Sequence, residues 1–98
     1  MSYNPTKAQI DALKAKHGDI FLIEVENKKA IVKAPGRKEL GAASTLAGSD
    51  PMKFNEQILK SCWLEGDEEI KTNDRLFMSV SAKLDKIIEI AEAEIKKL

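Results

Sequence analysis

Apolar and polar residues alternate through residues 20–34, and this pattern predicts a β-hairpin. Phe21, Ile23 and Val25 would share one face of the first strand, because successive side chains of a strand point to opposite sides. The polar stretch 26–29 supplies the turn. A hairpin alone is marginally stable in water, so we expect helices or a partner to cover this apolar face.

Apolar residues at spacings of three and four predict three helices besides the last one. The first begins at the capping-box sequence of residues 6–9 and ends before Gly18. The second spans residues 37–47. A stop-and-restart signal at residues 48–51 begins the third, which we expect to end at Gly66.

A long apolar stripe predicts a closing helix that begins at Asn73 or Asp74 and runs to Leu98. Its roughly 25 residues would form a rod of about 37 Å, which is longer than a small domain can cover. We therefore expect the end of the rod, with Ile90, Ile95 and Leu98, to contact a partner or a second copy of the chain.

These elements predict an α+β fold: an N-terminal helix, a β-hairpin, and a three-helix C-terminal part ending in a long amphipathic helix. We expect residues 1–98 to form a single domain. Within it, residues 1–18 hold a helix peripheral to the core, residues 19–35 the hairpin, and residues 36–98 the helical part.

Composition limits the classes of function. Lys and Arg together number 16, as do Asp and Glu, so no net charge draws the chain to nucleic acid or to an anionic membrane. Cys62 is the one cysteine, which excludes an intramolecular disulfide and favours a reducing compartment. Neither a secretory signal nor an apolar run of membrane-spanning length is present in the sequence. We expect a cytoplasmic protein without membrane contact.

The segment EGDEEIKTND, residues 65–74, is the most acidic stretch. It lacks the alternating ligands of a calcium loop, and Lys71 lies among its carboxylates. We interpret it as a connector in which Asp67 caps a short helical turn; an acidic partner-binding patch and a metal or catalytic site are the alternatives.

Other chemistry is sparse. His17 and Cys62 are too few ligands for a zinc site within one chain, and Gly36 lacks the further residues of a phosphate loop. We therefore expect no catalytic residue, metal or cofactor, and a protein that is not an enzyme.

Protein binding is the function that we expect. On the hairpin's second face, Ile20, Leu22 and Ile31 are apolar and less protected. Trp63 is either part of the core or an interface anchor.

A basic strip follows the return strand and supports an alternative, a small nucleic-acid-binding regulator. No aromatic residue is interleaved with these positive charges, so nucleic acid is the less favoured partner. The strip comprises Lys28, Lys29, Lys33, Arg37 and Lys38.

Four segments together resemble the small phage and prophage proteins of the tail-assembly-chaperone type: KKAIVKAPGRKEL, DPMKFNEQIL, CWLEGDEEI and LFMSVSAKLDKIIEI. The resemblance covers residues 19–98, and the family pattern does not require the helix at residues 6–17. It implies a non-enzymatic protein, acting in the bacterial host's cytoplasm, that binds the tape-measure protein or tail-tube subunits during tail assembly. It offers no functional residues to transfer.

Overall fold

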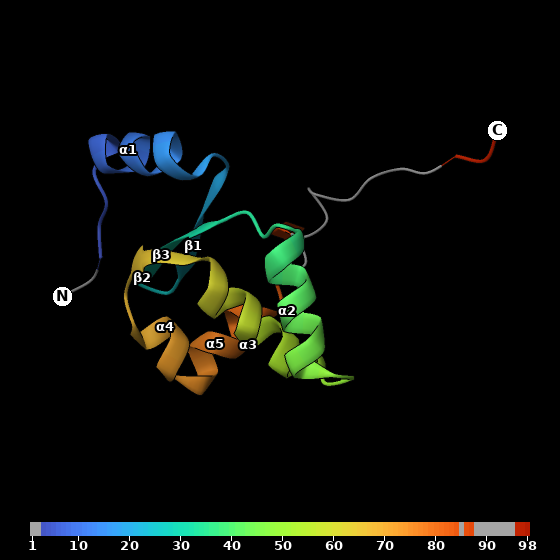
Figure 1. The fold of residues 1–98 in the computed structure, drawn as a ribbon. Helices are drawn as coiled ribbons and strands as arrows, with labels where there is room; N and C mark the ends of the chain where they lie inside the picture. The colour runs from blue at the N-terminus through green and yellow to red at the C-terminus, as the bar shows by residue number, and fades with distance from the viewer. Residues whose placement is uncertain (1–2, 85, 88–95) are drawn as a thin grey trace.

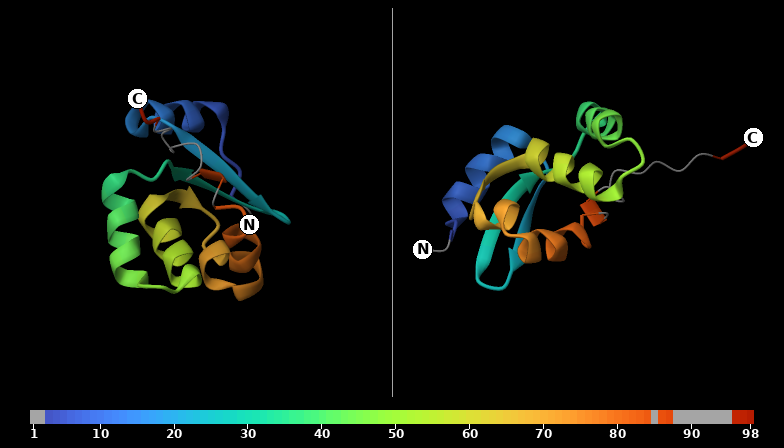
Figure 2. Two further views of the ribbon diagram at one scale, coloured as in Figure 1. Left: turned by 90° about the vertical axis from the view of Figure 1, so that its right-hand side faces the viewer. Right: turned by 90° about the horizontal axis from the view of Figure 1, so that it is seen from below.

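The computed structural model describes residues 3–84, 86–87 and 96–98. Its helices and three-stranded antiparallel sheet form an α+β fold, which confirms the predicted class. The elements, in chain order, are α1 (Lys7–His17), β1 (Ile20–Val25), β2 (Lys28–Lys33), α2 (Arg37–Ala47), α3 (Pro51–Cys62), β3 (Trp63–Gly66), α4 (Glu69–Thr72) and α5 (Asp74–Ser81). Helix α1 lies on one side of the sheet, and α3, α4 and α5 lie on the other (Figures 1 and 2).

The predicted hairpin is present, with a tight loop. Val25 lies opposite Lys28, so residues 26–27 alone form the turn. Phe21, Ile23 and Val25 pack against the core, as their alternation indicated. Helices α3 and α5 supply the cover that this face needs (Figure 1).

The third strand corrects the prediction for residues 63–66. Helix α3 ends at Cys62, and Trp63–Gly66 forms β3, which pairs antiparallel with β2. Gly66 lies opposite Ala30 at a φ of 154°. A Cβ there would lie 2.5 Å from the Cα of Ala30, so this pairing requires glycine. Strand β2 is therefore the central strand of the sheet.

Asp67, in the acidic segment 65–74, does not cap a helical turn, and this corrects its predicted role. Its carboxylate accepts the backbone N–H groups of Tyr3 (2.7 Å) and Lys29 (2.9 Å), while the Tyr3 hydroxyl donates to Glu65 (2.7 Å). Glu68 occupies the N-cap position of α4. The acidic segment is a connector, as interpreted, and it also ties the N-terminal segment to the sheet.

The predicted closing helix is interrupted after Ser81: residues 82–84 form a turn, and residues 86–87 are helical again. Helix α5 begins after its cap Asn73 and ends at Ser81. The N–H groups of Lys83 and Leu84 then bond to carbonyls three residues earlier, at 2.9 and 3.3 Å, and this tighter winding ends the regular helix. Beyond the turn, Leu84 and Ile87 are buried against the core.

The end of the predicted rod is not a helix where the structure describes it. Residues 96–98 have no regular secondary structure, and Leu98 is exposed. Ile90 and Ile95 lie outside the described residues.

The remaining helix starts follow the sequence. Thr6 and Gln9 form a reciprocal capping box at α1, and the Asp50 carboxylate accepts the Met52 N–H (3.0 Å) at α3. Helix α1 has no buried residue, as expected of a peripheral helix. In the described part of the chain, no helix is long and apolar enough to cross a membrane.

Candidate functional site

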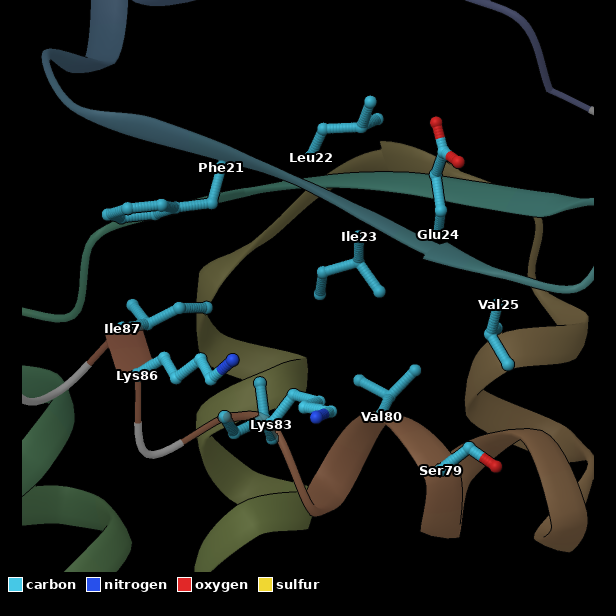
Figure 3. Close-up of a pocket in the computed structure, with 11 residues that line it drawn as sticks. Phe21, Leu22, Ile23, Glu24, Val25, Ser79, Val80, Lys83, Lys86 and Ile87 are labelled. Carbon is cyan, nitrogen blue, oxygen red and sulfur yellow. The ribbon is translucent and has the colours of Figure 1, made fainter.

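An apolar groove of about 460 Å³ opens between β1 and the chain from α5 to Ile87. Its upper wall carries the inward side chains of β1, Phe21, Ile23 and Val25, and its lower wall carries Val80 and Ile87 (Figure 3). A cavity of this volume accommodates several side chains or a small ligand. The groove is therefore large enough to bind part of another molecule, and its two walls are lined mainly by apolar side chains.

The groove has this shape because two elements diverge from one core. The wall residues of β1 are half-buried, whereas Val80, Leu84 and Ile87 are no more than 8% exposed. The turn after Ser81 directs the chain beneath β1 without closing against it (Figure 3). Part of the inner face of β1 thus stays open to solvent.

The strand beside the groove has an open edge. The Ala34 N–H donates to the carbonyl of Asp19 (3.0 Å), and in an antiparallel pair only every second residue bonds to its neighbour strand. In the register of β1 and β2, the bonded residues therefore include Phe21. The other residues direct their N–H and C=O groups toward the edge: Ile20, Leu22 and Glu24.

No strand pairs with that edge in the described ranges, where β1 pairs with β2 alone. Unpaired backbone donors and acceptors along an edge are a template for another extended chain. The groove and this template lie on the same strand.

Positive charge lies at the lower wall. Lys83 and Lys86 line the groove and are exposed, and neither forms an ion pair with another residue that the structure describes. Glu24 points away from the groove, on the same side of β1 as Leu22 (Figure 3). Among the described residues, the charged side chains of the lower wall are thus basic.

The residues predicted to bind a partner are separated by the fold. Leu22 is 50% exposed and Ile20 is half-buried beside a hollow that Ile10 of α1 also lines. Ile31 is 1% exposed, so its prediction as a less protected residue is wrong. Its strand is central, and α1 with the N-terminal segment lies over that face (Figure 2).

Trp63 lies at the margin of the core. It packs against the core cluster, and the Lys71 ammonium lies 4.4 Å from its ring centroid, a cation–π geometry. The sequence allowed Trp63 to be a core residue or an interface anchor. The structure places it against the core, and its role in binding a partner stays a prediction.

The basic strip is divided among different surroundings. Lys33 pairs with Glu39 (2.8 Å) and Lys28 with Glu69 (3.5 Å), and the Lys29 ammonium bonds to Asn4 (3.4 Å). Arg37 and Lys38 are exposed at the start of α2. Lys28, Lys29 and Lys33 lie on the central strand and not on an open edge.

Reactive groups are poorly placed for chemistry. Cys62 is 2% exposed, and burial, with the nearby Glu39 charge, raises the pKa of its thiol to about 11, so a thiolate is disfavoured. The described residues hold no group of three His, Cys, Asp or Glu side chains placed to bind a metal.

The sequence pattern missed the lower wall of the groove. The sequence pattern assigned the residues of this wall to one continuous helix and placed the apolar ones on its apolar face. The wall comprises Val80, Lys83, Leu84, Lys86 and Ile87. The two lysines beside that apolar face could have indicated a basic rim. The opening between these lysines and β1 depends on the turn after Ser81, which the sequence pattern did not predict.

Comparison with known protein families gave no match, and comparisons with curated proteins and with solved structures gave none either. The fold and the groove therefore carry the functional argument.

Proposed function

We propose that this chain is a non-enzymatic protein-binding module that captures another protein at the open edge of β1 and its adjoining groove. The observation that carries the proposal is the coincidence of unpaired strand backbone and an open apolar wall on one element. Strand addition uses both features, since the backbone supplies affinity and pockets for alternate side chains supply selectivity.

The resemblance to phage tail-assembly chaperones supplies the biological setting of the proposal. Such a protein would work in the host cytoplasm, holding the tape-measure protein or tail-tube subunits while the tail assembles. An open edge suits transient capture, because a segment that binds by strand addition can be released when it finds its final neighbours. Self-association through the C-terminal residues remains part of the expectation, with Leu98 exposed.

Co-expression with the tape-measure and tube proteins encoded by the same phage tests this function. Leu22→Pro removes an N–H that points to the open edge and leaves the β1–β2 bonds intact, and proline is tolerated at such edge positions. Leu22→Thr is the matched control, because it shortens the same side chain but keeps the N–H.

We expect the wild type and Leu22→Thr to co-purify with one of the two proteins and Leu22→Pro to lose it. Circular dichroism establishes that each variant is folded. If Leu22→Pro does not fold, Glu24→Pro repeats the test at another residue whose N–H points to the open edge. Capture of neither tail protein by the wild type, or equal capture by the threonine and proline variants, would contradict the proposal.

A further inference from the structure

We infer that the groove takes an extended segment of the partner, which adds to β1 as a fourth strand and presents an acidic side chain to Lys83 and Lys86. This inference rests on the proposed function and specifies the chemistry of the segment bound.

The backbone selects an extended segment over a helix. Ile20, Leu22 and Glu24 present N–H and C=O groups at the edge, and these groups gain bonds from a chain whose own backbone is unpaired. A helix uses its backbone groups internally, so it would leave those of β1 without partners.

The walls select apolar side chains at alternate positions. In an added strand, every second side chain would continue the row of Phe21, Ile23 and Val25 on the inner face. Those side chains would then lie over the buried residues of the lower wall, which include Val80 and Ile87 (Figure 3). The opposite side chains of the added strand would follow Leu22 and Glu24, which point away from the groove.

The rim selects negative charge. Lys83 and Lys86 are both exposed at the lower wall, and their aliphatic stems can lie along apolar surface while their ammonium groups reach a carboxylate. An acidic residue on the inner face of the added strand, beside its apolar residues, would meet them. A basic residue at that position would be repelled.

Two labelled synthetic peptides test the inference by fluorescence polarisation with the full chain. Both alternate valine and threonine; one ends its valine row in glutamate and the other ends it in lysine. Because exposed ion pairs are individually weak, replacing two attractions by two repulsions corresponds to about tenfold in affinity. We expect the glutamate peptide to bind about tenfold more tightly than the lysine peptide.

The double variant Lys83→Glu/Lys86→Glu should reverse this order, and added salt should reduce the difference. Lys38→Glu/Lys53→Glu is the control, because it changes the net charge equally at exposed positions that do not line the groove. Leu22→Pro should abolish binding of either peptide.

Several results would overturn the inference. Equal binding of both peptides, or an order unchanged by the Lys83/Lys86 reversal, would remove the acidic requirement. Binding that Leu22→Pro does not affect would remove strand addition. Self-association sensitive to Leu22→Pro without peptide binding would make a second copy the occupant, and uptake of a small apolar dye alone would make the groove a ligand pocket.

The two proposals fail separately. If a tail protein is captured through the edge but neither peptide binds, the proposed function stands and the segment's chemistry is wrong. If the glutamate peptide binds in the expected way but no tail protein is captured, the groove's chemistry stands and the biological assignment fails.

Discussion

Gly66→Ala should destabilise the protein severely, because the third strand depends on the close approach of Gly66 to Ala30. An added Cβ would lie 2.5 Å from the Cα of Ala30, 2.6 Å from its Cβ and 2.8 Å from the carbonyl oxygen of Lys29. Two of these three are backbone atoms of the central strand, so no side-chain rotation relieves the overlap. The φ of 154° adds strain for any residue with a side chain.

The expected loss combines two effects. Strain in a sparsely populated backbone region costs about 1–3 kcal/mol, and forcing extra volume into a packed site costs about 1–3 kcal/mol. The total of about 2–6 kcal/mol is a large part of the roughly 5–15 kcal/mol that keeps a small domain folded. Its effect on the melting temperature would exceed about 10 °C.

Gly41→Ala is the matched control, since it makes the same chemical change in the exposed middle of α2. Nothing lies within 4 Å of a Cβ built there, and alanine favours a helix over glycine by about 0.5–1 kcal/mol. We expect this variant to be slightly more stable than the wild type. The two substitutions should therefore have opposite signs.

Urea titration followed by Trp63 fluorescence and by circular dichroism measures both variants. Trp63 lies in β3 and is the one tryptophan of the chain, so its signal reports on the strand that Gly66 ends. A Gly66→Ala variant within about 0.5 kcal/mol of the wild type would refute the β2–β3 register.

Two further predictions concern titratable groups. Burial raises the pKa of the Asp67 carboxyl, but the N–H groups of Lys29 and Tyr3 and the nearby positive charge of Lys28 together hold the net pKa below its usual value. The contribution of Asp67 to stability is therefore full above about pH 4 and is lost as the pH falls further. Asp67→Asn should thus unfold more easily in urea at pH 7 and lose less stability than the wild type on acidification, with Asp11→Asn on exposed α1 as the control; parallel pH profiles for wild type and Asp67→Asn would count against the clamp. Cys62 is 2% exposed and its thiol pKa is raised to about 11. Because a reagent cannot reach the buried thiol in the folded protein, labelling at neutral pH should proceed only as fast as the chain unfolds, and rapid labelling without denaturant would show that the thiol is accessible.

Local chemistry in the sequence predicted the helix starts. Thr6, Asp50 and Asn73 each have an oxygen that accepts N–H groups of the following turn, and this interaction depends on neighbours in sequence alone. The hairpin register likewise followed from alternation and a short polar turn. These features need no distant contact to be specified.

Strand β3 was missed because its identity depends on distant residues. Trp63 continues the apolar face of α3, so the helical period alone extends the helix to Gly66. What overrides that period is the bonding of residues 63–67 to β2, including the Asp67 N–H to the Lys29 carbonyl at 2.9 Å. Ile31 was misassigned for a similar reason, since alternation gives its face correctly but not what lies over that face.

The third strand also determines where another protein can bind. With β3 on one side of β2, the return strand of the hairpin has no edge to offer, and the edge strands are the four-residue β3 and the six-residue β1. The turn after Ser81 also matters, because the chain beyond it places the buried Leu84 and Ile87 in the lower wall of the groove. The third strand thus leaves β1 as the longer unpaired edge, and the chain beyond the turn forms the apolar lower wall of the groove directly beneath it.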